Sequence, residues 1–167
     1  MYMRDTKAFT FSSCALIRDV TGCRPKFYNY LEIDSRSDLA GRKGTVVGWG
    51  KTYADQLVTT NGAYSDKQQK LEVPLLSETD CSAQFGQLEE TQLCAGGEAG
   101  EDSCRGDSGG PLLIQREEEE EGRQGILRPW YLLGIVSFGS RDCGDGQAAL
   151  YTRVSQYADW IQLHLQN

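Results

Sequence analysis

Short apolar runs separated by glycine-rich turns constrain the fold of this chain more than any other feature. The runs lie at 44–50, 71–76, 111–114, 130–136 and 150–154. Runs of this length and spacing are typical of an antiparallel barrel or sandwich. Strands and helices do not alternate regularly, which disfavours a parallel α/β sheet. The sequence therefore predicts an all-β domain.

Two helices are predicted beside these strands. Ser77-Glu-Thr-Asp80 is typical of a capping box, so we expect a short helix over 80–85. Pro74, just before it, suggests an edge strand or a bend. Near the C-terminus, apolar and aromatic side chains recur at helical spacing at Tyr157, Trp160, Ile161, His164 and Leu165. We expect these residues to form one face that docks a terminal helix onto the strands.

Composition excludes several classes of function. A chain of 167 residues supports one domain, or one domain and a small appendage. Its net charge is −7, and the run 117–121 supplies five glutamates, which we expect at a solvated hairpin tip. Without clustered Lys and Arg the chain is a poor nucleic-acid binder. No apolar run is long enough to span a membrane, and residues 1–10 lack the apolar core of a secretory signal.

Six cysteines indicate disulfides rather than a metal site. They lie at positions 14, 23, 81, 94, 104 and 143. No Cys-x-x-Cys or Cys/His cluster is present, so neither zinc nor another metal is expected. An even count in a glycine-rich chain points to an oxidising compartment. Because no signal peptide is visible, either the natural N-terminus lies upstream of Met1 or the thiols are free in the cytosol. We favour the first interpretation.

The segment 101–111 contains Gly106-x-Ser108-x-Gly110, a pattern that two unrelated hydrolase plans explain. In the α/β-hydrolase plan the serine lies between a strand and a helix, and an acid and a histidine follow. Asp142 or Asp159 and then His164 supply that order. However, the apolar run that follows Ser108 is typical of a strand. His164 lies on the helix face that we expect to pack against the strands. These features disfavour the plan.

The segment resembles instead the active-site signature of trypsin- and chymotrypsin-like serine proteases. Further landmarks occur in the order expected for that family, at 48–50, 134–139, 151–154 and 160–161. The resemblance covers about residues 38–166. It implies that 37–167 is the second of the family's two barrels, an antiparallel six-stranded Greek-key barrel with a short helix and a C-terminal helix.

The resemblance also assigns chemical roles within 101–111. Ser108 is the implied nucleophile, and the backbone N–H groups of Gly106 and Ser108 are the implied oxyanion donors. Asp107 is similar to the carboxylate that receives the new N-terminal ammonium when a zymogen is cleaved. Asp102 matches the acid at the base of the primary specificity pocket, which implies cleavage after Arg or Lys.

The remaining implied site residues lie nearer the C-terminus. Ser137, Phe138 and Gly139 resemble the edge segment that pairs with the substrate backbone. Ala149 stands where the family usually has glycine, so its methyl group is expected to narrow the pocket. Phe138 replaces a common tryptophan. The implied partner is a polypeptide substrate or another member of a protease cascade, and no cofactor is implied.

The family pattern also implies disulfides Cys81–Cys94 and Cys104–Cys143. The chain-entropy model gives them about 3 and about 4 kcal/mol of stabilisation. The segment 14–31 looks like part of a clip domain, the disulfide knot that precedes the protease domain in arthropod cascade proteases. Residues 1–36 are accordingly interpreted as a partial clip-like segment or a disordered tail. An extracellular location follows from the resemblance.

Several expected motifs are missing from the sequence. No Ala-Ala-His-Cys-like, Asp-Ile-Ala-Leu-like or Ile-Val-Gly-Gly segment occurs, and the residues after Asp5 do not match those around the family's catalytic aspartate. His164, the single histidine, does not fit the family's geometry for a base. Two hypotheses remain. One is a trypsin-like endopeptidase that is truncated and inactive as this chain alone, and the other is a non-catalytic protease homologue that acts as a regulatory binding module.

Overall fold

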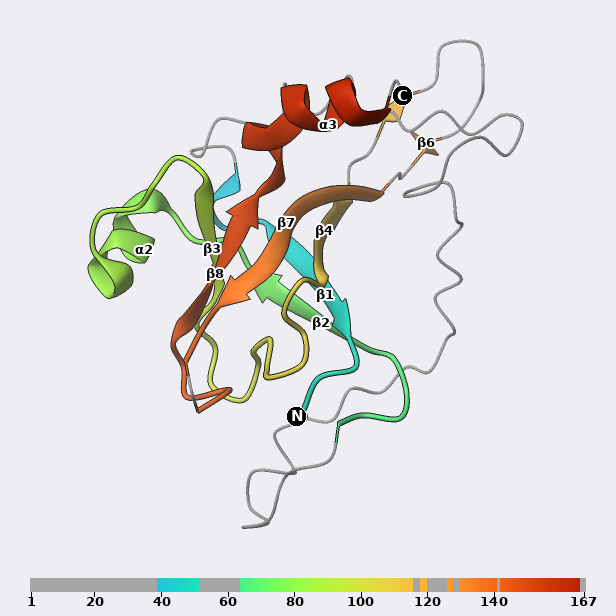
Figure 1. Cartoon of the computed structure of the whole chain (residues 1–167). Helices are drawn as coiled ribbons and strands as arrows, with labels where there is room; N and C mark the ends of the chain where they lie inside the picture. The colour runs from blue at the N-terminus through green and yellow to red at the C-terminus, as the bar shows by residue number, and fades with distance from the viewer. Residues whose placement is uncertain are drawn as a thin grey trace.

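The computed structural model describes residues 39–51, 64–115, 118–119, 126–127, 130–140 and 142–165. Six strands form its main sheet (Figure 1). They are β1 (Lys43–Gly48), β2 (Gln69–Pro74), β3 (Gln92–Gly96), β4 (Pro111–Gln115), β7 (Trp130–Phe138) and β8 (Ala148–Arg153). All pairs are antiparallel, and the order across the sheet is β2-β1-β4-β7-β8-β3. The all-β prediction is confirmed.

The sheet curls until its two edge strands meet. Leu75, just after β2, forms an isolated bridge with Ala95 in β3, and the Leu76 N–H donates to the Cys94 carbonyl at 3.0 Å. These contacts bring together strands at opposite ends of the strand order. Pro74 ends the edge strand β2, where its missing N–H removes no ladder bond from an interior strand.

Apolar side chains from all six strands fill the interior of the curled sheet. The most buried of them include Val73, Leu112, Ile114 and Tyr151, each at most 1% exposed. A methyl group on Gly134 would lie 3.1 Å from the Tyr151 Cβ, so glycine allows β7 to approach β8 at that point. The core therefore packs against β7, which carries Ser137 and Phe138, and β8, which carries Ala149.

Helix α2 (Glu78–Phe85) begins two residues earlier than the sequence predicted. The Ser77 hydroxyl oxygen accepts from the Asp80 N–H at 3.1 Å and donates to the Asp80 carboxylate at 2.6 Å. Gly86 ends the helix with φ at 78°. A disulfide joins Cys81 of α2 to Cys94 of β3, with Cα atoms 5.9 Å apart. Figure 1 shows the helix beside β3, outside the sheet.

The C-terminal helix α3 (Ala158–Leu165) forms, but the expected docking face is wrong. Trp160 is 61% exposed, and its ring stacks on the exposed His164 ring with centroids 4.2 Å apart. Among the residues of this face whose side-chain burial is described, Ile161 packs against the core cluster. The 3₁₀ turn η4 (Val154–Tyr157) precedes α3. Trp160 and His164 are one turn apart within α3, so the predicted spacing holds, but the face that these two residues share is exposed.

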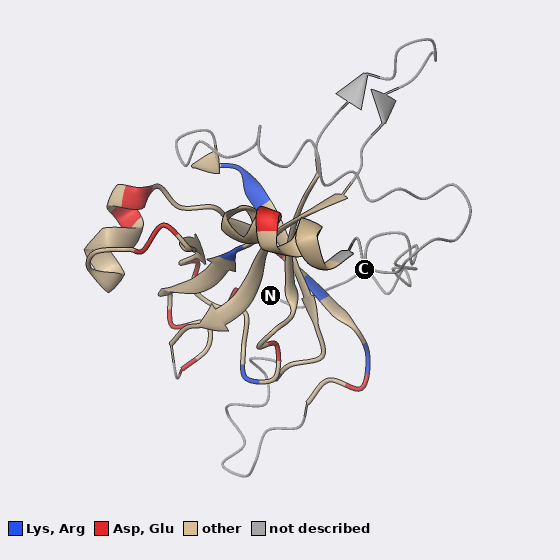
Figure 2. Cartoon of the chain, turned by 45° about the horizontal axis from the view of Figure 1, so that its top comes forward, with Lys and Arg blue, Asp and Glu red and all other residues tan. Residues whose placement is uncertain are grey.

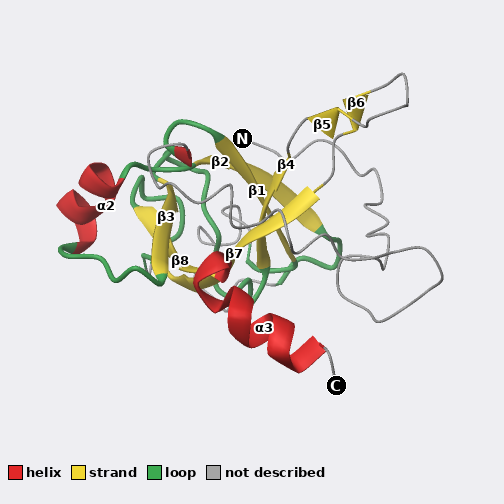
Figure 3. Ribbon diagram, turned by 90° about the horizontal axis from the view of Figure 1, so that it is seen from above, coloured by secondary structure: helices red, strands yellow, loops and turns green. Residues whose placement is uncertain are grey.

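A two-stranded ribbon, β5 (Glu118–Glu119) and β6 (Ile126–Leu127), lies apart from the main sheet (Figure 3). Two glutamates of the acidic run therefore lie in a strand, and the expected hairpin tip falls outside the described residues. Figure 2 shows the described Lys and Arg residues spread over several elements rather than gathered on one face. Among the described helices none has the length and apolarity needed to cross a membrane.

The Ser77 cap predicts the effect of one substitution. Ser77→Ala removes the acceptor for the Asp80 N–H, and we expect a loss of about 1 kcal/mol in the free energy of unfolding. Urea denaturation measures it. Ser82→Ala is the matched control, because the Ser82 side chain forms no hydrogen bond with the described residues. An equal effect of both substitutions would show that the cap does not stabilise α2.

Candidate active site

Ser108 lies in an exposed turn directly before strand β4. In Figure 1 the loop that leads to β4, drawn in yellow, lies at the lower end of the curled sheet. A strand, not a helix, follows the serine. The α/β-hydrolase plan requires a helix at that position, so the structure excludes it.

The carboxylate of Asp107 connects this loop to the end of strand β1. One oxygen, Oδ1, accepts from the Gly50 N–H at 2.8 Å, and Oδ2 accepts from the Cys104 N–H at 3.0 Å. Hydrogen bonds to a carboxylate are stronger than those between neutral groups. The side chain next to Ser108 is therefore turned toward β1 and away from solvent.

Two glycines make room for the Asp107 carboxylate. A methyl group on Gly48 would lie 2.9 Å from the Asp107 Cγ, and one on Gly50 would lie 2.5 Å from the same atom. Both distances are far below van der Waals contact. The Gly-Trp-Gly spacing at 48–50 is thus explained by the space that Asp107 occupies.

The backbone of the loop is held on the other side by strand β7. The Gly109 N–H donates to the Val136 carbonyl at 2.9 Å, and the Val136 N–H donates to the Gly110 carbonyl at 2.9 Å. The Gly110 N–H also donates to the Asp107 carbonyl at 2.8 Å. Ser108 is therefore flanked by a side chain fixed to β1 and by a backbone fixed to β7.

Gly106 and Ser108 present backbone donors at the surface. Gly106 has φ at +99°, a conformation that favours glycine, and both residues are exposed. Their two N–H groups form no hydrogen bond with any described residue. The aromatic ring of Tyr64 lies against Gly106, where a methyl group would meet its Cε1 at 2.5 Å. The sequence contains no signal for this contact.

Asp102 lies in a different electrostatic environment from Asp107. Its Oδ2 accepts a long hydrogen bond from the Gly144 N–H at 3.5 Å, and its Oδ1 is buried with no hydrogen-bond partner among the described residues. Burial raises the pKa of Asp102 to about 6. The disulfide Cys104–Cys143, with Cα atoms 5.4 Å apart, joins the two chain segments that meet here. A cation would satisfy the unpaired oxygen.

Strand β8 contributes Tyr151 to the same region. The Tyr151 hydroxyl donates to the Ser103 oxygen at 3.3 Å, inside the core. Burial, with a smaller contribution from the charge of Asp102, raises the pKa of Tyr151 to about 12. The tyrosine therefore stays neutral and fixes the residue next to Asp102.

The end of β7 carries the implied substrate-pairing residues. Ser137 and Phe138 are exposed, and Phe138 has 64% of its surface accessible. Gly139 lies opposite Ala149, because a methyl group on Gly139 would be 3.4 Å from the Ala149 Cβ. Ala149 itself is 1% exposed. The methyl group of Ala149 thus occupies space between these two segments.

His164 is not placed near Ser108. Its ring Nδ1 lies 2.7 Å from the Trp160 carbonyl oxygen, within α3. In Figure 1 this helix lies at the upper end of the sheet, opposite the loop before β4. In the part of the chain described, no histidine contacts the Ser108 hydroxyl.

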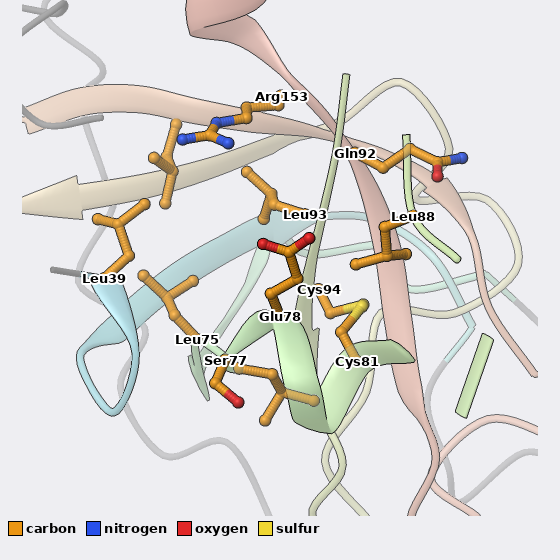
Figure 4. Close-up of a pocket in the computed structure, with 12 residues that line it drawn as sticks. Leu39, Leu75, Ser77, Glu78, Cys81, Leu88, Gln92, Leu93, Cys94 and Arg153 are labelled. Atoms are coloured by element: carbon orange, nitrogen blue, oxygen red, sulfur yellow. A yellow bond between two sulfur atoms is a disulfide. The ribbon is translucent and has the colours of Figure 1, made fainter. Parts of the chain in front are cut away.

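A small cavity lies away from all of these residues (Figure 4). It holds about 30 Å³, which is enough for a water molecule. Half of its lining residues are leucines, and the side chains of Glu78 and Arg153 also line it. None of its lining residues belongs to 101–111.

Comparison with known proteins identifies the family. The sequence model of the family described as Trypsin matches residues 24–161. The chain belongs to the trypsin family of serine proteases. Phenoloxidase-activating factor 1 of Holotrichia diomphalia is 41% identical over 126 residues, which are 73% of this chain and 30% of that protein. CLIP domain-containing serine protease B4 of Anopheles gambiae is 39% identical over 128 residues, which are 74% of this chain and 31% of that protein.

Among solved structures, neuropsin, a serine protease of mouse brain, superposes with a TM-score of 0.58 at 29% identity. The match covers 75% of this chain and 49% of neuropsin. The chain thus spans about half of this trypsin-family structure and about 30% of the curated insect relatives. The family match begins at residue 24, earlier than the 38–166 interval over which the motifs were recognised, and residues 24–38 lie outside the described part of the structure.

The contact between Gly50 and Asp107 predicts a local effect on the Ser108 loop. In Gly50→Ala the new methyl group displaces the Asp107 carboxylate, so the Cys104 N–H loses its acceptor. We expect hydrogen exchange at the Cys104 amide to become at least about tenfold faster, as loss of a charge-assisted hydrogen bond implies. Amide exchange followed by NMR measures it.

Gly41→Ala is the control, because a methyl group at Gly41 meets nothing within 4 Å. It adds backbone strain, since Gly41 has φ at +78°, but it does not touch Asp107. Unchanged exchange at Cys104 in Gly50→Ala would contradict the role given to the carboxylate.

Proposed function

We propose that this chain carries the nucleophile and the primary specificity site of a trypsin-like serine endopeptidase that cleaves after Arg or Lys. The observation that carries the proposal is the loop around Ser108. There the Asp107 carboxylate holds a turn whose exposed Gly106 and Ser108 N–H groups have no described partner. Membership of the trypsin family supports this assignment.

The proposed chemistry is acyl transfer. The Ser108 oxygen attacks the substrate carbonyl carbon, the electron pair of the C=O bond moves to oxygen, and the hydroxyl proton passes to a base. The N–H groups of Gly106 and Ser108 donate to the resulting oxyanion. The C–N bond then breaks, the amine leaves with that proton, and water hydrolyses the acyl-serine.

The proposed specificity comes from Asp102. Its buried, unpaired Oδ1 favours a cationic side chain, because a positive charge stabilises the ionised carboxylate. Ala149 opposite Gly139 narrows the space available to that side chain. Ser137, Phe138 and Gly139 pair with the substrate backbone along the end of β7.

The cellular context is also proposed from the relatives. Their names include phenoloxidase-activating factors and a melanization protease of Drosophila melanogaster. We expect the partner of this chain to be a polypeptide substrate or another protein of such a cascade. The two disulfides favour an oxidising, extracellular compartment.

We expect the 167-residue chain alone to lack peptidase activity, because its one histidine binds Trp160 within α3. In subtilisin, loss of the catalytic base lowers turnover on the order of a million-fold. A fluorophosphonate probe, which labels activated serines, should therefore not label Ser108. Rapid labelling that disappears in Ser108→Ala would contradict this expectation.

The same histidine favours a second candidate function, a non-catalytic protease homologue that regulates other proteases by binding. The two candidates predict different transcripts. Full-length transcript sequencing that finds His- and Asp-bearing exons between the codons for about Leu31 and Asp38 supports the endopeptidase. A continuous locus and secretion of this form as a stable protein support the binding module.

Binding of benzamidinium, a planar cation that resembles the end of an arginine side chain, tests the specificity site. Because the pKa of Asp102 is raised to about 6, the carboxylate is ionised above that pH and increasingly protonated below it. We expect affinity to be constant at neutral pH and to fall below pH 6, by about tenfold per unit at low pH. Isothermal titration calorimetry measures it.

Asp102→Asn removes the charge and keeps the shape, so we expect it to weaken benzamidinium binding at least about tenfold at neutral pH and to abolish the pH dependence. Asp142→Asn, which changes an exposed acid on the neighbouring loop, is the control. Equal affinity of wild type and Asp102→Asn would refute the specificity assignment.

A further inference from the structure

We propose that Gln84 of helix α2 is a positioning residue for the specificity site, acting through the first residue of strand β8. This inference rests on the proposed function. The Gln84 Oε1 accepts from the Ala148 N–H at 2.9 Å, across 64 residues of sequence. Neither the family resemblance nor the sequence pattern assigned a role to Gln84.

The Ala148 N–H needs an acceptor because of where the strands end. Ala148 pairs with Gly96, which is the last residue of β3, so the ladder between β3 and β8 stops at this point. Ala148 is nevertheless fully buried, at 0% exposure. A buried N–H without a partner is unfavourable, and the Gln84 amide oxygen supplies the partner from outside the sheet.

Ala148 leads directly to residues of the proposed specificity site. Ala149, the next residue, packs opposite Gly139, and Tyr151 bonds to Ser103. On the other side, the Gln147 N–H donates to Asp145 Oδ1 at 2.9 Å. The position of Ala148 therefore affects the Ala149 methyl group, which narrows the proposed pocket. It also affects residues 145–147, which follow the Gly144 N–H that reaches Asp102.

Asp145 holds the segment before Ala148. Its carboxylate accepts from the Gln147 N–H, and Gln84 accepts from the N–H of the next residue, Ala148. The Ser140 hydroxyl donates to Asp145 Oδ2 at 2.6 Å, and this bond, with the one from Gln147, holds the pKa of Asp145 below its ordinary value. Gly144, adjacent to Asp145, supplies the N–H that reaches Asp102. Displacement of Ala148 is thereby transmitted to the Asp102 carboxylate.

Helix α2 is a firm support for Gln84. The disulfide at Cys81, one turn earlier, ties the helix to β3, and the Ser77 hydroxyl caps its first turn. Gln84 thus lies on an element fixed to the strand that pairs with β8. The contact is a brace between two parts of the fold, and its loss allows the start of β8 to move.

Benzamidinium titration of the whole chain tests the proposal. Gln84→Leu keeps the size of the side chain and removes the acceptor, so we expect binding at neutral pH to weaken several-fold. We also expect the midpoint of its pH dependence to move below that of the wild type, because a displaced wall admits water to Asp102. Gln84→Glu retains an acceptor oxygen and should restore both properties.

The matched control is Gln87→Leu, because Gln87 is exposed and forms no hydrogen bond with the described residues. Thermal unfolding of every variant separates a loss of stability from a change at Asp102. A Gln84→Leu protein that is merely less stable, with wild-type affinity and pH midpoint, overturns the inference. A wild-type chain that does not bind benzamidinium overturns the proposed function, and this inference with it.

Discussion

The carboxylate of Asp107 is the contact on which the geometry around Ser108 depends. The segment from Gly106 to Gly110 contains three glycines, and such a sequence has little conformational preference of its own. By accepting from the Gly50 and Cys104 N–H groups, the carboxylate joins this flexible segment to β1 and to the disulfide loop at once. Gly106 and Ser108 are exposed, while the carboxylate of the residue between them is held toward β1.

Two aspartates five positions apart show how environment separates the roles of identical side chains. Asp107 has a backbone donor for each oxygen, so its charge is stabilised within the protein. Asp102 accepts a long hydrogen bond from Gly144, its buried Oδ1 has no partner among the described residues, and burial raises its pKa to about 6. The first arrangement suits a structural anion. The second leaves a negative charge that an external cation stabilises, as expected when one site divides its tasks between carboxylates.

Much of this architecture could be predicted from the sequence, because it depends on local patterns. Glycine turns and apolar runs located five of the six strands of the main sheet but not β3 (Gln92–Gly96), and the Ser77 cap located α2 to within two residues. The orientation of α3 could not be predicted, because helical spacing shows which residues share a face of the helix but not which face packs against the sheet. The contacts that Ala148 and Gly106 make with distant residues could not be predicted from the sequence either. Gln84 lies 64 residues from Ala148, and Tyr64 carries no motif.

The described residues include groups suited to some steps of serine-protease catalysis but not to all of them. In the proposed assignment, this chain supplies the nucleophile Ser108, the N–H donors of the exposed residues Gly106 and Ser108, and the Asp102 carboxylate, which is suited to a cation. Proton transfer is the step for which the described residues offer no group, since His164 is bound within α3. Binding of a cationic side chain and stabilisation of an oxyanion do not require that proton acceptor. Under the proposed function, recognition of a cationic side chain therefore does not depend on proton transfer, and the same geometry is compatible with an endopeptidase and with a binding module.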